Sequence, residues 1–506
     1  MKRILPMAAL WLCVIAGARA QTSSVFTVEE SGPRSKRINI VLLSEGYTAA
    51  DMPTFATHVD TVRNFLFTKE PWQQYRSYCN VYRIEIASNE SGTDNGAAGG
   101  LKDTYFQSGF NTPTVTQLLT LTGTGNSRAL TLLNTHVPEY DVALVIVNDT
   151  KYGGAGGGIA TTSIHSSSAG IAEHEIGHSF AGLADEYDTE YTLYTPAERT
   201  NNTAQTVRSL IRWNIWIDPA TPVPTPETMT YDSSVGLFEG SMYRTAGWYR
   251  PHNNSLMRNL FRPVGQVNRE AFVLNIYSRV GPIDGSSPAT TSRTLTGFET
   301  LSFSVTPKSP SSGLALGVTW QIDGVAVPGA TSPSFVTTSD ALGNGSHSVT
   351  AVVRDPTTFV RNDPSTLLDD SVTWPFTISN QLPATLAAWR AAYGSDSGNP
   401  TGDGLSNLVK YALRLDPLKR ALPGERPVIS FVSDGGNDYL TLTVPRASRR
   451  ADVNYVVEVS SDLSDWRSGP GYTVTIQDSD NLLVVRDTVP KGPLIPRFIR
   501  LTVALP

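Results

Sequence analysis

The chain has 506 residues, a net charge of −6 and 17% charged residues. That length exceeds what one hydrophobic core can serve, so we expect two to four domains. The sequence holds no basic run, which excludes the electrostatic footprint of a nucleic-acid-binding protein or of one that binds an anionic membrane. With only two cysteines, a disulfide-built scaffold is also excluded.

Residues 1–20 have the pattern of a secretory signal peptide. Lys2 and Arg3 form a basic start, an apolar stretch follows from Met7, and Ala18-Arg19-Ala20 is a small-x-small cleavage site. We therefore expect a secreted protein, extracellular or periplasmic, in which Cys79 is the remaining cysteine. No later stretch is long and apolar enough to span a membrane.

Strands and helices alternate along the first part of the chain. Residues 36–43, 81–87 and 141–148 are predicted strands, and the last is apolar on both faces. A helix is predicted to begin near Thr48, with Asp51 completing a capping box, and a second one covers residues 128–133. This order predicts an α/β layer with a mostly parallel or mixed sheet.

The strongest motif lies in residues 173–187, which read E-H-E-I-G-H-S-F-A-G-L-A-D-E-Y. A helix is predicted over 168–181, where His174 and His178, four residues apart, project from one face. Two imidazoles so placed can each bind Zn²⁺ at about 2.0–2.1 Å. Glu175 lies between them and can act as general base on a metal-activated water.

The third metal ligand is predicted to be Asp185. Gly182 permits a left-handed turn that directs the chain back toward the histidines, and a catalytic zinc site keeps three protein ligands. Glu186 and Tyr187 are then candidates for the surroundings of the site. Two alternatives are that Asp185 is a surface carboxylate and that Glu198 is the ligand, although Pro196 and the asparagines beyond disfavour a helix there.

The glycine-rich segment 152–158 lacks the Lys-Ser/Thr ending of a phosphate-binding loop and is interpreted as a flexible turn. Residues 159–163 are predicted to form a short strand. By analogy with zinc peptidases, this strand would border the cleft and pair with substrate backbone.

The motif resembles the active-site signature of the IgA-peptidase family of bacterial zinc metallopeptidases, a metzincin-like group. The resemblance continues in F-E-G-S-M-Y from Phe238, W-Y-R-P from Trp248 and N-S-L-M-R from Asn254, and it covers roughly residues 36–280. It implies a zincin-like catalytic domain and a Met-turn at Met257 beneath the metal. The resemblance does not imply that immunoglobulin A is the substrate of this protein.

Two departures from the general metzincin motif H-E-x-x-H-x-x-G-x-x-H are visible. The glycine, Gly182, and the third ligand, Asp185, each fall one place late. Asn259 stands where some metzincins have an oxyanion-stabilising tyrosine; Tyr187, Tyr243 and Tyr249 are the candidates to replace it, and the sequence selects none. His252 is either a cleft residue or an ordinary loop histidine.

Beyond residue 283 the sequence changes to short strands of period two. Residues 284–380 resemble a bacterial immunoglobulin-like β-sandwich in which Trp320 is a core residue. Residues 381–506 are predicted to hold two short helices around a degraded calcium-type loop at 398–404, followed by a second β-sandwich. Asp403 remains in that loop, but Lys410 stands where an acidic residue is common. Because calcium needs six to eight oxygen ligands, the sequence disfavours calcium binding at this loop.

Taken together, these patterns predict a secreted zinc metallopeptidase, residues 21–283, with β-rich accessory modules. We expect one catalytic Zn²⁺, a protein or peptide substrate, and modules that space the enzyme or bind a surface or polymer. The alternatives are an inactive peptidase-like binding or adhesion protein, and a zinc amidase acting on cell-wall peptide.

Overall fold

The computed structural model describes residues 21–95, 100–110, 115–192, 194–296, 300–313, 315–379, 382–492 and 496–506. The predicted signal peptide, residues 1–20, lies outside them. The chain divides into two compact units that alternate in sequence. The first consists of residues up to Asp284, Lys308–Gly317 and Arg354–Asp370; the second consists of Gly285–Pro307, Val318–Val353 and Ser371–Pro506.

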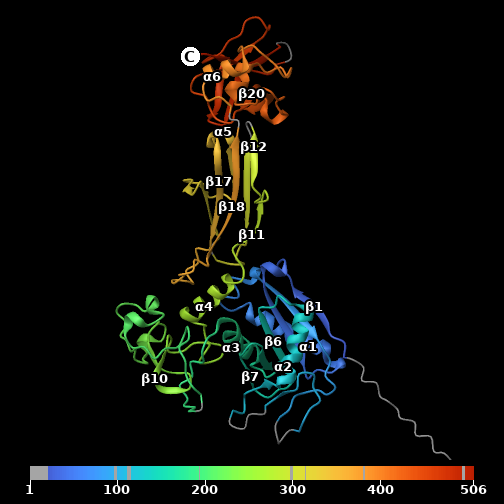
Figure 1. Ribbon diagram of the computed structural model, residues 1–506, viewed down its shortest axis with the longest axis vertical. Helices are drawn as coiled ribbons and strands as arrows, with labels where there is room; N and C mark the ends of the chain where they lie inside the picture. Colours follow the sequence, from blue (N-terminus) through green and yellow to red (C-terminus); the bar gives the residue numbers. More distant parts are fainter. Residues whose placement is uncertain are drawn as a thin grey trace, which may run out of the picture. The chain divides into compact units, whose positions relative to one another are not determined.

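A six-stranded mixed sheet organises the first unit (Figure 1). Its strand order is β1 (Ser24–Glu29), β3 (Cys79–Glu85), β2 (Ile38–Glu45), β6 (Val142–Val147), β8 (Ala160–Ser163) and β7 (Gly154–Ala155). The four central strands are parallel, and β1 and β7 are antiparallel to their neighbours. β2 and β6 are buried along their whole length, as their apolar sequences predict.

Helices cover both faces of this sheet. The helices are α1 (Met52–Leu66), α2 (Gly123–His136), α3 (Ser168–Ala181) and α4 (Gln266–Tyr277). Ile40 and Leu42 of β2 point into one core with α1, α3 and α4, whereas Val41 and Leu43 point into the other core with α2. The expected α/β layer with a mixed sheet is confirmed, and so is the capping box between Thr48 and Asp51.

The two later segments of the first unit contribute to its buried interior. Asp355 Oδ2 accepts hydrogen bonds from the hydroxyls of Tyr75 at 2.6 Å and Tyr277 at 2.7 Å. The Tyr78 hydroxyl donates to the Lys308 carbonyl at 2.6 Å, and Leu368 belongs to the same core as α3. Residues beyond the sheet and its helices are therefore needed to satisfy buried polar groups of this unit.

Within the described residues, the second unit is built from four sheets. Their strand orders are β11-β13-β16, β12-β18-β17-β14-β15, β19-β20-β23-β22 and β21-β24. The bounds are β11 (Ile283–Ser287), β12 (Arg293–Thr296), β13 (Thr300–Pro307), β14 (Gly317–Ile322), β15 (Val325–Ala326), β16 (Ser334–Thr338), β17 (Gly345–Arg354), β18 (Asp369–Ser379), β19 (Val428–Asp434), β20 (Asn437–Pro445), β21 (Asn454–Ser460), β22 (Thr473–Ser479), β23 (Leu482–Pro490) and β24 (Phe498–Ala504).

Trp320 is a core residue of this unit, as predicted. It is fully buried and stacks on Phe335 and Trp374 with ring centroids 5.2 and 5.8 Å away. The short helices are α5 (Ser339–Leu342), α6 (Leu386–Tyr393) and α7 (Asn407–Leu413). Across the described ranges, no helix has the length and hydropathy needed to cross a membrane.

Candidate metal centre

Helix α3 spans Ser168–Ala181, the range that the sequence predicts. It ends at Gly182, whose φ of 64° lies in the left-handed region. The Gly182 and Leu183 amides then donate back to the carbonyls of His178 and Gly177, which closes the last turn. This turn sends the following residues back along the helix face that carries the histidines.

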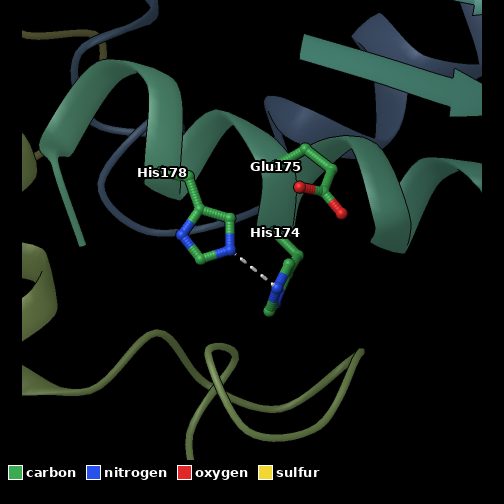
Figure 2. A group of neighbouring side chains, drawn as sticks. All are labelled: His174, Glu175 and His178. Atoms are coloured by element: carbon green, nitrogen blue, oxygen red, sulfur yellow. Dashed lines mark hydrogen bonds between the residues drawn. The ribbon is translucent and has the colours of Figure 1, made fainter. Parts of the chain in front are cut away.

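Three side-chain atoms converge beside α3. The Nε2 atoms of His174 and His178 are 3.1 Å apart (Figure 2). Asp185 Oδ1 lies 3.0 Å from the first and 3.2 Å from the second. Ligands about 2.0–2.1 Å from a tetrahedral zinc ion are about 3.3 Å from one another, so the triangle formed by these atoms has the size of one face of such a site.

The other ring nitrogens show which form the imidazoles adopt. His174 Nδ1 lies 3.1 Å from the Leu256 carbonyl, and His178 Nδ1 lies 2.8 Å from the Leu183 carbonyl. A carbonyl only accepts, so both Nδ1 atoms carry a proton, and the Nε2 atom of each ring has a lone pair whenever that ring is neutral. With neutral rings, two lone pairs and a carboxylate oxygen face one another, and this arrangement takes up either a proton or a metal ion. The donor set therefore fits a zinc ion.

The pKa values of Asp185 and His178 also indicate that the cluster stabilises positive charge. Burial would raise the pKa of Asp185, but its hydrogen bonds to the two imidazoles hold that pKa well below its usual range. Burial would lower the pKa of His178, but the bond to Asp185 and its charge outweigh this and raise the pKa to about 9. The carboxylate thus stabilises positive charge at the point where the three atoms meet.

Glu175 follows His174 on the same helix, and its side chain lies on the far side of His174 from His178 (Figure 2). His174, Glu175 and His178 offer ligand atoms within 4.8 Å of one another, but Asp185 is closer to both imidazoles than that. Asp185 Oδ1 forms the third corner of the triangle, and Glu175 adjoins the two imidazoles. Burial raises the pKa of its carboxyl group.

The glycine-rich segment packs against these side chains. A Cβ on Gly156 would lie 2.6 Å from His178 Cβ, and one on Gly154 would lie 3.1 Å from Glu175 Oε1. The segment, predicted to be a flexible turn, contains β7, which pairs with β8 through Gly154 and Ala155. The edge of β8 that was expected to face the substrate is thus partly covered at Thr161 and Thr162.

Met257 lies directly under the helix. It is fully buried, and a Cβ on Gly177 would come within 2.8 Å of its sulfur atom. Its carbonyl accepts a hydrogen bond from the Glu186 amide at 2.9 Å. The absence of a side chain at Gly177, between the two histidines, therefore allows the methionine to approach the helix.

Glu186 and Asn201 hold the chain on both sides of Asp185. Asn201 pairs with the amide and the carbonyl of Ala184 at 2.7 and 2.9 Å and also donates to Glu186 Oε1 at 2.9 Å. Ser255 and Asn268 donate to the same carboxylate at 2.7 and 2.9 Å. The sequence analysis did not predict Asn201, Ser255 and Asn268 as parts of the site. No local sequence pattern indicates that their side chains form hydrogen bonds with Ala184 and Glu186.

The structure separates the three candidate tyrosines. The Tyr187 hydroxyl lies 3.5 Å from His174 Nε2, and the Tyr243 hydroxyl donates to Asp185 Oδ2 at 2.9 Å. Tyr249 instead points to Glu239, 3.5 Å away, and packs with Trp213 in a separate core. Tyr187 and Tyr243 are therefore at the site and Tyr249 is not.

Two further candidates also lie away from the triangle. His252 is buried, and its Nε2 is 2.9 Å from Gln266 Oε1. Glu198 accepts hydrogen bonds from the Thr203 hydroxyl at 3.0 Å and the Ala204 amide at 2.8 Å. Neither side chain is directed at the two histidines.

In the calcium-type loop a lysine takes the place of a metal ion. Lys410 Nζ lies 3.0 Å from Asp403 Oδ2, and both side chains are fully buried. The same ammonium group donates to Thr401 Oγ1 and to the Lys419 carbonyl, each at 2.7 Å. The oxygens of this loop are thus already bound to a positive charge.

The model of the family described as IgA Peptidase M64 matches residues 26–231. That range includes α3 and Asp185 and ends before Tyr243 and Met257. The match supports a peptide hydrolase, and a metallopeptidase family makes a metal plausible at the group formed by His174, Glu175 and His178. No curated protein matches the chain.

Solved structures show only weak similarity. Bovine butyrophilin is 10% identical, with 44% of this chain and 97% of that chain covered and a TM-score of 0.11. The titin I-band fragment I67–I69 is 10% identical, with 40% and 87% covered and a TM-score of 0.12. Neither similarity bears on the fold or the function.

Proposed function

We propose that the chain is a secreted zinc-dependent endopeptidase with a metzincin-like centre. His174, His178 and Asp185 are the protein ligands, and zinc, when bound, makes water acidic and polarises a substrate carbonyl. The observation that carries the proposal is the triangle of two imidazole lone pairs and one carboxylate oxygen, with sides of 3.0 to 3.2 Å, beside Glu175.

The remaining chemistry belongs to residues of the chain. Glu175 accepts the proton of the water that attacks the peptide carbonyl and returns it to the leaving amine. The raised pKa of its carboxyl group suits both steps. The Tyr187 hydroxyl lies 3.5 Å from His174 Nε2, whereas the Tyr243 hydroxyl is already bonded to Asp185 Oδ2, so Tyr187 is assigned to the developing negative charge on the carbonyl oxygen.

The test is a cleavage profile of the full-length protein on a library of denatured cellular proteins and on isolated cell-wall peptides. We expect new amino termini in the protein library that disappear with a chelator and return when Zn²⁺ is restored. Zinc-bound protein that cleaves neither substrate would favour a binding or adhesion protein. Cleavage confined to cell-wall peptides would favour an amidase, and either result would overturn the proposal.

A further inference from the structure

The hairpin of β9 (Phe238–Ser241) and β10 (Arg244–Arg250) carries an unusual turn beside the metal centre. Ser241 pairs with Arg244, so Met242 and Tyr243 form a two-residue loop. Their φ angles are 48° and 59°. Positive φ at both positions defines the turn type that most favours Asn-Gly, Asp-Gly or Gly-Gly, because larger side chains are strained there.

Two other hairpins in the chain have the same type of turn with small residues in the loop. The hairpin of β14 and β15 places Asp323-Gly324 in the loop, with φ of 50° and 78°. The hairpin of β19 and β20 places Gly435-Gly436 there, with φ of 57° and 83°. The turn beside the metal centre is therefore built from two bulky residues at positions where the same chain elsewhere uses Asp and Gly.

A contact with Asp185 accounts for the tyrosine in this turn. The Met242 amide donates to the Asp185 carbonyl at 3.0 Å, and the Tyr243 hydroxyl donates to Asp185 Oδ2 at 2.9 Å. The Tyr243 amide donates to the Tyr187 carbonyl at 2.9 Å. The turn thus fixes both the backbone and the carboxylate of Asp185.

The consequence concerns how Asp185 presents its oxygens. With Oδ2 bound to the Tyr243 hydroxyl, Oδ1 is the oxygen that faces His174 and His178. The carboxylate plane cannot rotate without breaking that hydrogen bond. Backbone strain that persists where the surrounding contacts over-determine it is typical of functional sites.

We propose that Tyr243 is a positioning residue that holds Asp185 as a ligand through one oxygen, and that the strained turn exists to deliver its hydroxyl. This inference rests on the proposed function, because it assumes that Asp185 binds zinc. It adds a determinant of metal affinity from a hairpin 58 residues beyond the ligand.

The test compares the full-length Tyr243→Phe variant with the wild type and with Tyr249→Phe. Tyr249 is a matched control, since its hydroxyl is on the same hairpin but 3.5 Å from Glu239 Oε1. Zinc dissociation constants come from competition with a chelator of known affinity, and the absorption spectrum of the Co²⁺-substituted protein reports on ligand geometry. We expect Tyr243→Phe to raise the dissociation constant by about 10–100-fold and to alter the Co²⁺ spectrum, and Tyr249→Phe to change neither.

A second variant, Tyr243→Asn, separates the hydroxyl from the turn. Asparagine adopts the left-handed region more readily than tyrosine, yet its side chain is too short to reach Asp185. We expect it to weaken zinc binding as Tyr243→Phe does, although the turn is less strained.

Two outcomes are decisive. Wild-type affinity and spectrum in both Tyr243 variants would overturn the positioning role while leaving the zinc site intact. A loss of stability in the metal-free variants with no change in zinc affinity would show a structural role only and would also overturn it. A wild-type protein that binds no Zn²⁺ would instead contradict the proposed function.

Discussion

Asp185 in the first unit and Asp403 in the second are both carboxylates that the sequence associates with metal ions, and the structure surrounds them with different partners. Asp185 faces two imidazole nitrogens at 3.0 and 3.2 Å, whose other nitrogens are held by carbonyls. Asp403 faces the ammonium group of Lys410 at 3.0 Å and accepts the amides of Leu405 and Ala421, each at 3.0 Å.

The difference shows what decides whether an acidic cluster needs an ion from solution. Around Asp403 the chain supplies the positive charge itself, and backbone amides satisfy the remaining lone pairs. Around Asp185 every nearby ligand atom is an acceptor when the histidines are neutral. Buried acceptors without a donor or cation are costly, so the first cluster must take up a proton on a histidine or a metal ion, whereas the second already holds its own ammonium group.

The sharpest test of the first cluster is Glu175→Gln. Because Glu175 lies beside the ligand triangle, its amide variant should retain zinc. Loss of the general base should lower kcat by about 10²–10⁴-fold. Metal analysis and peptide turnover on the same sample measure the two quantities, and near-normal turnover with bound zinc would remove Glu175 from the mechanism.

The ligand assignment is tested by Asp185→Ala beside Glu198→Ala. Removing a ligand should weaken zinc binding by more than the roughly 100-fold that marks the upper range for residues around a site, so the first variant should purify largely without zinc. Glu198 is bonded to Thr203 and Ala204, so the second should keep its metal. The reverse pattern in elemental analysis would contradict both the ligand set and the metzincin-like assignment.

Local sequence signals predicted the helix and its end well. The range 168–181, the left-handed Gly182 and the shared face of His174 and His178 follow from periodicity and glycine geometry over a few residues. The parallel core of the sheet was similarly visible in apolar runs such as that of β6. These features depend on neighbours in sequence, which the sequence displays directly.

The rest of the site depends on contacts between distant segments. The Tyr243 hydroxyl bonds a residue 58 positions away, and Asn201 brackets Asp185 from 15 to 17 positions away. Nothing near Tyr187, Tyr243 or Tyr249 in the sequence selects one of them, since their roles follow from how irregular segments pack. The close approach of the glycine-rich segment to His178 was missed for the same reason, because it is visible only in the fold.

The second cluster is tested by Lys410→Met. The change leaves the buried Asp403 carboxylate without its ion partner, and breaking a buried pair in this way typically costs about 3–5 kcal/mol. Urea unfolding of the full chain gives the loss, and hydrogen exchange in α7 assigns it to the second unit. Replacing both partners, in Asp403→Asn/Lys410→Met, should cost less than the single change; an undisturbed Lys410→Met would show that the ammonium is not what satisfies the loop.

The smallest effect is expected from calcium itself. An ion that binds only the native state stabilises it by about 2.7 kcal/mol at 100 times its dissociation constant. Ca²⁺ at about 1 mM would therefore slow hydrogen exchange in α7 clearly if its dissociation constant were about 10 µM. We expect no such slowing in the wild type, because the Asp403 and Thr401 oxygens that a calcium ion would use already bind the Lys410 ammonium. In Lys410→Met the repelling charge is gone, and Ca²⁺ should then restore part of the lost protection. If Ca²⁺ slowed hydrogen exchange in the wild type, the Asp403 cluster would also bind a metal ion from solution, and the contrast with the Asp185 cluster would be wrong.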